Sequence, residues 1–343
     1  RGLGDVYKRQ LYIKRIDFYR ISEVIKMDIL KLSPVFKDYI WGGTRLRDDF
    51  GLKTDINPVA EGWMLACHKD GMNTIDGGEY DGKTLESVIK EGDKSKIAGT
   101  NSEKFPYFPV LIKLIDAKDN LSVQVHPDNE YAARVEHEFG KTEMWYVLDA
   151  APGATLIYGF KNKIGKEEFK QAIESNTLFD VLNVVEVKKG DMFFIEAGTV
   201  HAIGKGALIA EIQQNSNSTY RVYDYGRLGK DGKPRELHIQ KAIDVSKTEP
   251  AKYGTKPFGE KEEISGGTRQ MLTECPLFSV YNYELCGKVD LNANEESFNH
   301  ILVVDGSGKI GGREFKKGDS FFVPANYGNY EIDGNGEFIL TKV

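Results

Sequence analysis

Short apolar runs separated by glycine and polar turn residues recur along most of the chain and predict a protein made mainly of β-strands. The runs at residues 144–148 and 207–214 both fit buried strands. Residues 87–98 and 165–182 depart from this pattern, and in the second stretch Phe169 and Ile173 recur at helical spacing. We therefore expect a mainly β protein with a small helical insertion near residues 165–182.

Two segments near the C-terminus look like degenerate copies of earlier ones. Residues 301–306 (Ile-Leu-Val-Val-Asp-Gly) resemble 145–150, and residues 318–325 (Gly-Asp-Ser-Phe-Phe-Val-Pro-Ala) resemble 190–197. This similarity predicts two related β-barrels. Sliding the copies over each other places Asn299 opposite Glu143 and Asn329 opposite His201, so the second barrel is expected to hold no metal and to cover the first.

The domain boundaries follow from composition. We expect a catalytic domain at residues 27–245, a linker at 246–268 that is rich in Lys, Glu, Gly and Pro, and a second barrel at 269–343. Residues 1–26 have neither the apolar segment nor the cleavage site of a secretory signal, whereas Met27 opens a segment that looks like a natural start. The first 26 residues are therefore predicted to be a non-native or disordered extension.

Charge and cysteine content exclude several classes of protein. The 343-residue chain has a net charge of -6 and an isoelectric point near 5.7, which argues against a general nucleic-acid surface. No stretch of about 18 uncharged apolar residues predicts a membrane span. The three cysteines form no CxxC pair and leave one thiol unpaired under any pairing, as is typical of a reducing compartment. A cytoplasmic protein without nucleic-acid or membrane partners is expected.

Four polar residues form a candidate metal site. Gln124 and His126 are two positions apart, so on a strand their side chains leave the same face and can converge on one ion. Glu143 precedes an apolar run, and His201 follows a strand-turn pattern. Two imidazoles, a carboxylate and an amide oxygen suit one zinc ion with an open position for water or substrate. The other four histidines are interpreted as ordinary core or surface residues: His68, His137, His238 and His300.

The segments around these residues resemble a known family. Gln-x-His, a distant Glu and the pattern Gly-x5-Glu-x-Gly-x2-His resemble the two cupin motifs. More specifically, the chain is similar to the short bacterial form of the type I mannose-6-phosphate isomerases. The matching segments are residues 39–43 (Tyr-Ile-Trp-Gly-Gly), 60–64 (Ala-Glu-Gly-Trp-Met), 108–116, 121–128 (Leu-Ser-Val-Gln-Val-His-Pro-Asp), 141–145 (Lys-Thr-Glu-Met-Trp), 197–202 and 213–224. The implied fold is a pair of jelly-roll type cupin barrels.

The resemblance implies roles for individual residues. The family's zinc ligands fall on the four residues already selected, and its catalytic residues fall on Arg221, Lys141 and Glu211. For the sugar phosphate substrate, Ser122 joins Lys141 and Arg221 as a candidate binding residue. The implied reaction interconverts mannose 6-phosphate and fructose 6-phosphate through an enediol, in a monomer or homodimer. Glu211 lies in an apolar strand, where an unpaired carboxylate is costly, so a functional role is favoured.

Other interpretations stay open at this point. Lys141 fits a solvated turn residue, and Arg221 fits a structural ion pair with Asp224. Longer relatives carry a His and a Tyr where this chain has Gly140 and Ile203, so no base role is transferred to either position. The alternative functions are another metal-dependent cupin enzyme acting on a sugar phosphate and a non-catalytic sugar-binding cupin.

Overall fold

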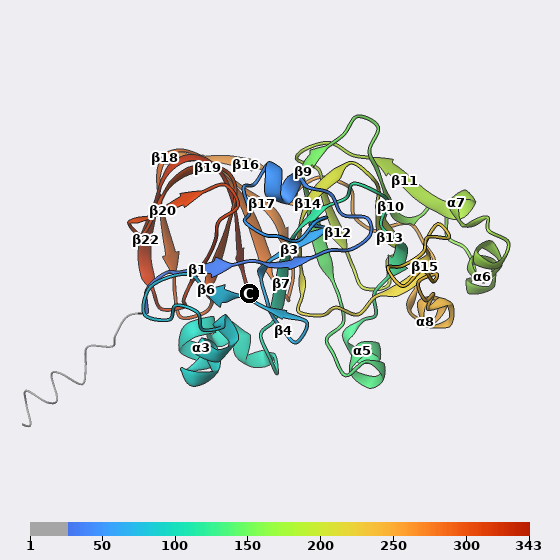
Figure 1. Cartoon of the computed structure of the whole chain (residues 1–343), viewed down its shortest axis with the longest axis horizontal. Helices are drawn as coiled ribbons and strands as arrows, with labels where there is room; N and C mark the ends of the chain where they lie inside the picture. The colour runs from blue at the N-terminus through green and yellow to red at the C-terminus, as the bar shows by residue number, and fades with distance from the viewer. Residues whose placement is uncertain (1–26) are drawn as a thin grey trace, which may run out of the picture.

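The computed structural model describes residues 27–343, and the extension predicted at residues 1–26 lies outside this part of the chain. Three large antiparallel sheets form the molecule (Figure 1). The six-stranded sheet consists, in spatial order, of β12 (Met192–Ile195), β9 (Glu143–Ala150), β14 (Ala207–Gln214), β7 (Val110–Asp116), β3 (Glu61–Leu65) and β2 (Val35–Lys37). The five-stranded sheet consists of β11 (Leu182–Glu186), β10 (Thr155–Phe160), β13 (His201–Ile203), β8 (Val123–Val125) and β15 (Tyr220–Tyr223).

These two sheets face each other and enclose the first apolar core. Trp145 and Phe193 from the six-stranded sheet pack with Tyr158 and Ile203 from the five-stranded sheet. Strands β7, β9, β12 and β14 read as nearly continuous apolar runs because their other face is also buried, against the third sheet. The side chains that break these apolar runs are therefore the ones that require an explanation.

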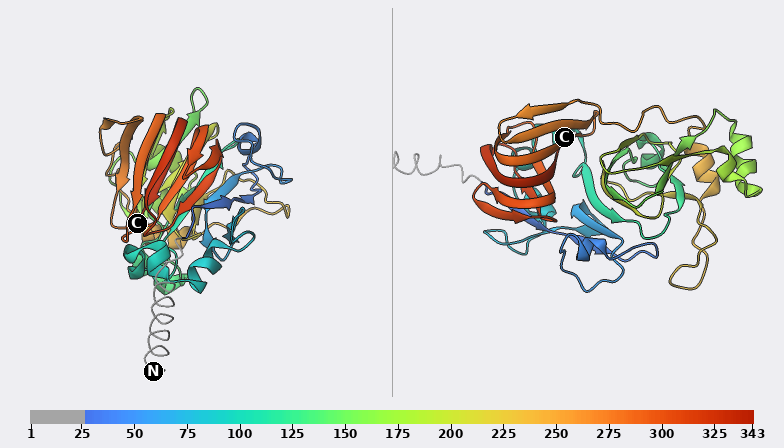
Figure 2. Two further views of the ribbon diagram at one scale, coloured as in Figure 1. Left: turned by 90° about the vertical axis from the view of Figure 1, so that its left-hand side faces the viewer. Right: turned by 90° about the horizontal axis from the view of Figure 1, so that it is seen from above.

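The third sheet has nine strands and curls around its own core. Its members are β16 (Lys261–Ile264), β17 (Gly267–Glu274), β18 (Ser279–Ala293), β22 (Gly328–Lys342), β19 (Asn299–Ile310), β21 (Ser320–Val323), β1 (Leu30–Ser33) and β6 (Thr74–Ile75), with β20 (Arg313–Lys316) paired to β19. Seen from above, it curls on one side of the molecule and the first two sheets lie on the other (Figure 2). Tyr283 and Phe338 stack inside it with ring centroids 4.7 Å apart.

Short helices lie around the outside of the sheets (Figure 1). The described helices are α2 (Arg45–Asp48), α3 (Leu85–Glu91), α4 (Lys94–Ala98), the 3₁₀ turn η1 (Thr100–Lys104), α5 (Asn129–Val135), α6 (Lys166–Glu174), α7 (Leu178–Val181) and α8 (Ile239–Val245), and a short hairpin joins β4 (Cys67–His68) to β5 (Gly71–Met72). Phe169 of α6, Leu178 of α7 and Ala242 of α8 pack on the outer face of the five-stranded sheet. The mainly β cupin architecture and the helical insertion near 165–182 are confirmed.

The internal similarity extends to strand register. Glu143 at the start of β9 pairs with Ile195 of β12, and Asn299 at the start of β19 pairs with Val323 of β21. The Asn299 amide donates hydrogen bonds to the Asn292 carbonyl and to the Tyr330 hydroxyl. A neutral amide thus stands at the register position where the first copy has a carboxylate.

Sequence order and sheet membership differ at the domain boundaries. β1, from the N-terminal part, pairs with β21 of the nine-stranded sheet, with Leu30 opposite Phe322. The predicted linker at residues 246–268 includes β16, which belongs to the same sheet. The predicted boundaries at 245 and 268 therefore describe order along the chain, and they do not describe which sheet each strand joins.

Candidate metal centre

The five-stranded sheet brings three predicted site residues into one row. Gln124 on β8 is paired with His201 on β13 and, on its other side, with Arg221 on β15. Side chains directly opposite each other on antiparallel strands leave the same face of the sheet. The imidazole, the amide and the guanidinium therefore follow one another across three strands, although they are far apart in the sequence.

The six-stranded sheet supplies the opposite wall. Lys141, Glu143 and Trp145 are spaced two apart and share a face on and just before β9. Glu211 on β14 is paired with Trp145 on one side and with Lys113 on β7 on the other. Both walls thus consist of cross-strand rows, and this arrangement positions their side chains rigidly.

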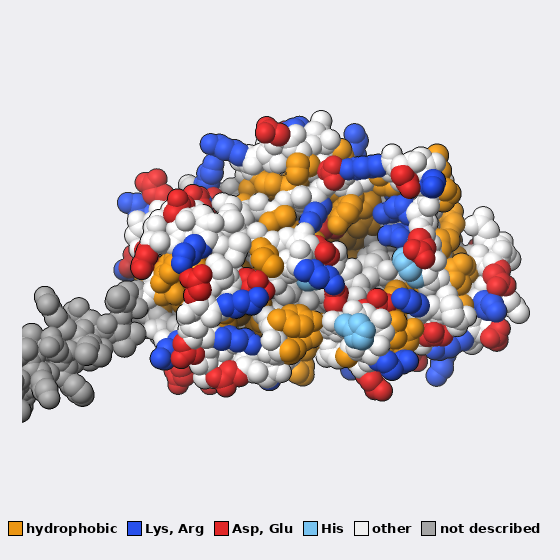
Figure 3. Space-filling model, turned by 60° about the horizontal axis from the view of Figure 1, so that its bottom comes forward, with side chains coloured by type: hydrophobic (Ala, Val, Ile, Leu, Met, Phe, Trp, Pro, Cys, Tyr) orange, Lys and Arg blue, Asp and Glu red, His pale blue; other side chains and the backbone are white. Residues whose placement is uncertain are grey.

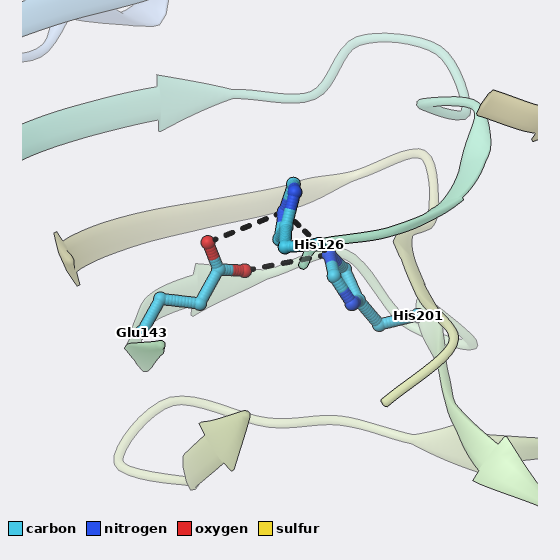
Figure 4. Close-up of side chains that lie close together, drawn as sticks. All are labelled: His126, Glu143 and His201. Carbon is cyan, nitrogen blue, oxygen red and sulfur yellow. Dashed lines mark hydrogen bonds and ion pairs between the residues drawn. The ribbon is translucent and has the colours of Figure 1, made fainter. Parts of the chain in front are cut away.

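Three ligand-type side chains converge between the walls (Figure 4). Nε2 of His126 lies 3.1 Å from Nε2 of His201. The two Glu143 carboxylate oxygens lie 3.5 Å from Nε2 of His126 and 3.4 Å from Nε2 of His201. All three side chains are buried, and one ligand atom from each lies within 4.8 Å of the others.

Backbone hydrogen bonds fix the orientation of both imidazoles. Nδ1 of His126 lies 2.8 Å from the Ser218 carbonyl, and Nδ1 of His201 lies 2.8 Å from the Thr199 carbonyl. A carbonyl oxygen only accepts, so each Nδ1 carries the proton and each neutral ring presents an Nε2 lone pair to the other. Two lone pairs facing each other beside a carboxylate suit a cation between them, and the Nδ1 contacts are the outer hydrogen bonding expected of metal-ligating histidines.

Gln124 completes the predicted ligand set from the side. Its Nε2 lies 3.4 Å from Nε2 of His201. Rotation of the amide by 180° exchanges its nitrogen and oxygen, and the oxygen is the ligand atom that an amide offers to a metal. The residues thus fit a divalent cation held by two nitrogens and two oxygens, the donor mixture accepted by zinc.

Burial sets the protonation of these ligands. It lowers the pKa of His126 well below its usual range and lowers the pKa of His201 to about 4. Burial, with Glu211 nearby, raises the pKa of Glu143 to about 7, although Lys141 opposes the shift. Neutral imidazoles are the form that binds metals, and a bound cation would favour the ionised form of Glu143.

Lys141 is a buried member of the site. Its Nζ lies 2.9 Å from Oε2 of Glu143 and 3.1 Å from Nε2 of His126, and the residue is 4% exposed. The interpretation of Lys141 as a solvated turn residue is therefore wrong.

A second buried charge pair adjoins the ligands. Nζ of Lys113 lies 3.0 Å from Oε1 of Glu211 and 3.7 Å from Glu61, while the Trp145 indole donates to Oε2 of Glu211. Burial alone would raise the pKa of Glu211, but Lys113 and Lys141 outweigh it and lower this pKa to about 2. Burial would lower the pKa of Lys113, and Glu211 and Glu61 reverse that shift. Glu211 is thus held ionised.

Lys113 and Glu61 are site residues that were not predicted from the sequence. The signal was available, because Lys113 interrupts the apolar run of residues 110–115 just as Glu211 interrupts its own strand. A charge in a strand buried on both faces implies a partner, and the two strands that hold this pair are neighbours. Glu61 is harder to select from the sequence, because its role depends on a hydrogen bond from the Trp63 indole and on its contact with Lys113.

A cavity of about 270 Å³ opens beside the ligands. Its lining includes Ser122, Gln124, Lys141, Glu211 and Arg221 of the predicted residues, together with Tyr39, Trp41, Lys113 and Arg235. Ser122 is buried, with Oγ 3.4 Å from Oε1 of Gln124. All the predicted catalytic and substrate-binding residues therefore line one cavity next to the candidate metal ligands.

Arg221 does not form the structural ion pair with Asp224 that was its alternative interpretation. Nη1 of Arg221 donates to the Glu236 carbonyl at 2.8 Å. In the described chain, Asp224 forms its ion pairs with Arg227 and Arg235. The interpretation of Arg221 as the ion-pair partner of Asp224 is thus wrong, and its guanidinium is directed to the cavity lining instead.

Comparison with known proteins places this site in a family. Residues 29–151 match the model of the phosphomannose isomerase type I catalytic domain, and residues 268–343 match that of the mannose-6-phosphate isomerase cupin domain. The chain is 40% identical over 319 residues to the probable mannose-6-phosphate isomerase GmuF of Bacillus subtilis, covering 91% of this chain and 98% of the relative. The chain belongs to the type I phosphomannose isomerase family.

Two further mannose-6-phosphate isomerases support the assignment over nearly the whole length. The mannose-6-phosphate isomerase of Streptococcus mutans is 38% identical over 306 residues, covering 88% of this chain and 94% of the relative. The crystal structure of the mannose 6-phosphate isomerase from Bacillus subtilis superposes with a TM-score of 0.85 at 36% identity, covering 92% of this chain and all of that one. These matches span His201, Glu211 and Arg221, which lie between the two domain models.

Two surface observations accompany the site. No helix within residues 27–343 is long and apolar enough to cross a membrane. Basic and acidic side chains are interspersed over the face in Figure 3, without a broad basic surface on that face.

Proposed function

We propose that this chain interconverts mannose 6-phosphate and fructose 6-phosphate and depends on one zinc ion. The observation that carries the proposal is the pair of neutral imidazoles whose Nε2 atoms lie 3.1 Å apart beside a buried carboxylate and a sugar-sized cavity. Membership in the type I phosphomannose isomerase family supports the substrate and the reaction.

The proposed reaction moves a proton between C2 and C1 of the open-chain sugar through an enediol. Gln124, His126, Glu143 and His201 would hold the zinc ion. A zinc ion there would act as a Lewis acid that stabilises negative charge on the substrate oxygens. The rest of the catalysis is assigned to side chains of the two walls.

Glu211 is the first candidate for the base. Its ion pair with Lys113 keeps it ionised and fixes its position, and the same pair lowers its intrinsic basicity. Lys141 is the candidate proton donor or charge stabiliser, because its Nζ lies 2.9 Å from Glu143 and 3.9 Å from Glu211. Arg221, at the far end of its row, would stabilise the enediolate or hold the substrate.

The test is the conversion of mannose 6-phosphate by the purified chain before chelation, after chelation and after restoration of zinc. Activity that disappears with the chelator and returns with zinc would support both the reaction and the metal. The substitution His137→Ala is a matched control, since His137 is exposed and lies outside the ligand set. Folded, zinc-loaded protein without turnover would contradict the proposal.

Two other functions would then be tested in turn. Turnover of a different sugar phosphate would indicate another metal-dependent cupin enzyme, and binding of mannose 6-phosphate without turnover would indicate a sugar-binding cupin. We also propose a cytoplasmic enzyme, in keeping with the free cysteines Cys67, Cys275 and Cys286.

A further inference from the structure

The loop between β14 and β15 carries the carbonyl that orients one of the predicted metal ligands. The Ser218 carbonyl lies 2.8 Å from Nδ1 of His126, and this part of the loop lies outside the strands. Two of its backbone N–H groups donate to side chains: that of Asn217 donates to Glu138, and that of Ser218 donates to the Ser216 hydroxyl. The orientation of the His126 ring therefore depends on the side chains that hold this loop.

Glu138 binds all three residues of the loop through one carboxylate oxygen. Its Oε2 accepts from the Ser216 hydroxyl at 3.4 Å, from the Asn217 backbone N–H at 3.4 Å and from the Ser218 hydroxyl at 3.2 Å. The Ser216 hydroxyl in turn accepts from the Ser218 backbone N–H at 3.3 Å. A single carboxylate thus ties three consecutive residues together, and the last of them presents its carbonyl to His126.

The Glu138 carboxylate is held from its other side by the hairpin of β4 and β5. Its Oε1 forms an ion pair with Lys69 and lies 3.9 Å from Nε2 of His68. Burial would raise the pKa of Glu138, but Lys69 and His68 outweigh burial and lower this pKa below its usual value. An ionised carboxylate accepts at both oxygens, so Glu138 can bind the hairpin and the loop at the same time.

The segment that carries Glu138 is fixed by its own contacts. The Phe139 backbone N–H donates to the Tyr107 hydroxyl at 2.8 Å, and the two rings pack with centroids 3.9 Å apart. The next backbone N–H, that of Gly140, donates to Oδ1 of Asn129 at 2.9 Å. Glu138 therefore acts on the loop from a fixed position, in a segment that runs directly into β9.

The other ligand imidazole is oriented independently of Glu138. Nδ1 of His201 lies 2.8 Å from the Thr199 carbonyl. Thr199 belongs to a turn that is held by the backbone, because its N–H donates to the Glu196 carbonyl at 3.0 Å. The His201 ring thus serves as an internal control for any effect that Glu138 has on the His126 ring.

We propose that Glu138 is a positioning residue for the metal centre, which clamps the loop so that the Ser218 carbonyl holds His126 in the orientation and tautomer of a ligand. Outer hydrogen-bond partners of this kind fix the ring and raise its basicity toward a metal. The metal itself rests on the proposed function, whereas the orientation of the ring depends on neither metal nor reaction. Glu138 would therefore govern how tightly the metal is held and contribute little to the proton transfer.

Zinc affinity is the first measurement. It would be determined by competition with a chelator of known affinity for wild type, Glu138→Ala and Glu138→Gln. We expect tenfold to hundredfold weaker binding for Glu138→Ala, the usual effect of removing an outer partner of a ligand. Gln keeps an acceptor oxygen, so Glu138→Gln should lose at most about fivefold. Glu130→Ala is the matched control, because it removes an exposed carboxylate of α5.

Two results of this measurement would overturn the proposal. Wild-type zinc affinity in Glu138→Ala would mean that the loop keeps its place without the carboxylate. Equal losses in Glu138→Ala and Glu138→Gln would mean that the negative charge attracts the cation without clamping the loop. A wild type that binds zinc through the clamp but does not turn over mannose 6-phosphate would remove the proposed function and leave the clamp standing.

A second measurement needs no metal. The imidazole nitrogen resonances of chelated protein with isotopically labelled histidine report which nitrogen of each ring carries the proton. Glu138→Ala should move His126 from the Nδ1-protonated form toward a mixture of tautomers and leave His201 unchanged. An unchanged His126 ring would overturn the proposal. Equal changes in both rings would also overturn it, because they would mean that Glu138 supports the fold in general.

Ser218→Ala covers the case in which Glu138→Ala does not fold. This variant keeps the Ser218 carbonyl and removes the hydroxyl that donates to Glu138. Zinc binding should weaken by about threefold to tenfold, the range of one hydrogen bond. Unchanged zinc affinity in Ser218→Ala, at an unchanged melting temperature, would overturn the proposal.

Discussion

Lys113 and Glu211 are cross-strand neighbours on β7 and β14, and their charged atoms lie 3.0 Å apart in the buried wall of the cavity. Neither residue is in the ligand set, yet Glu211 adjoins Lys141, which touches two ligands. The pair therefore links the interior of the six-stranded sheet to the candidate metal centre. It also provides a test of which side chain moves the proton.

Replacing Glu211 by Gln should abolish most of the turnover while zinc stays bound. A general base contributes roughly 10²–10⁴-fold, so kcat should fall by that range. Metal content by atomic spectroscopy and exchange of the substrate C2 proton with solvent would be measured together. Glu284→Gln is the control, because Glu284 forms an exposed pair with Lys261. Proton exchange at the wild-type rate in Glu211→Gln would remove Glu211 from the role of base.

Substitution of a metal ligand and substitution of Arg221 should have different effects on zinc content. His201→Ala removes one of the two facing nitrogens, so both zinc content and turnover should fall. Arg221→Ala leaves the ligands in place and should lower turnover by at least tenfold with little loss of zinc. Zinc content and kcat would be determined on the same preparations. Equal zinc loss in the two variants would place Arg221 in the wrong role.

Zinc should stabilise the fold. A ligand that binds only the native state adds about 2.7 kcal/mol to the free energy of unfolding at 100 times its Kd. Thermal melting should therefore shift upward by several degrees when zinc is restored to chelated protein. The variant His201→Ala should show little of this shift. A shift of the same size in the variant would indicate that zinc binds elsewhere.

Asp224 should contribute stability that is lost in acid. Burial would raise its pKa, but hydrogen bonds from Arg235 and Arg227 outweigh burial and hold the pKa below its usual value. A carboxyl with a lowered folded-state pKa stabilises the protein above the unfolded-state pKa, about 3.9, and loses this contribution as pH falls through the folded-state value. The contribution should therefore be full from pH 5 to 7.

Comparison with Asp224→Asn isolates this effect. Urea unfolding of both proteins between pH 3 and pH 7 would give the difference in their free energies of unfolding. We expect a constant difference above about pH 5, where Asp224 is ionised in both states, and a smaller one below about pH 3.9. A difference that stays constant to pH 3 would mean that the charge of Asp224 is not the source of its stabilisation.

The predicted ligands could be selected from the sequence because each has a local signal. Gln124 and His126 share a face through two-residue spacing, and the structure brings His126, Glu143 and His201 together. Lys113 and Arg235 were missed because their roles depend on neighbours about 100 and 11 positions away, Glu211 and Asp224. Periodicity predicts which side chains share one face of a strand, but it does not predict which strand lies beside it.

The sheet to which β1 belongs could not be predicted from the sequence for the same reason. The four residues of β1 contain nothing that selects β21 as a partner nearly 290 positions later. The internal similarity predicted the relation between the copies correctly in register, since repeated strands keep their pairing. It carried no information on a strand that lies outside the repeat.

The pairing of β1 with β21 also bears on how the molecule can be divided. A fragment cut near residue 245 would deprive β21 of one neighbour and leave the β1 segment without its sheet. An unpaired strand edge is a template for aggregation. The two halves should therefore melt in a single cooperative transition and express poorly when produced separately, so during synthesis β1 must wait until β21 has been made before the fold can close.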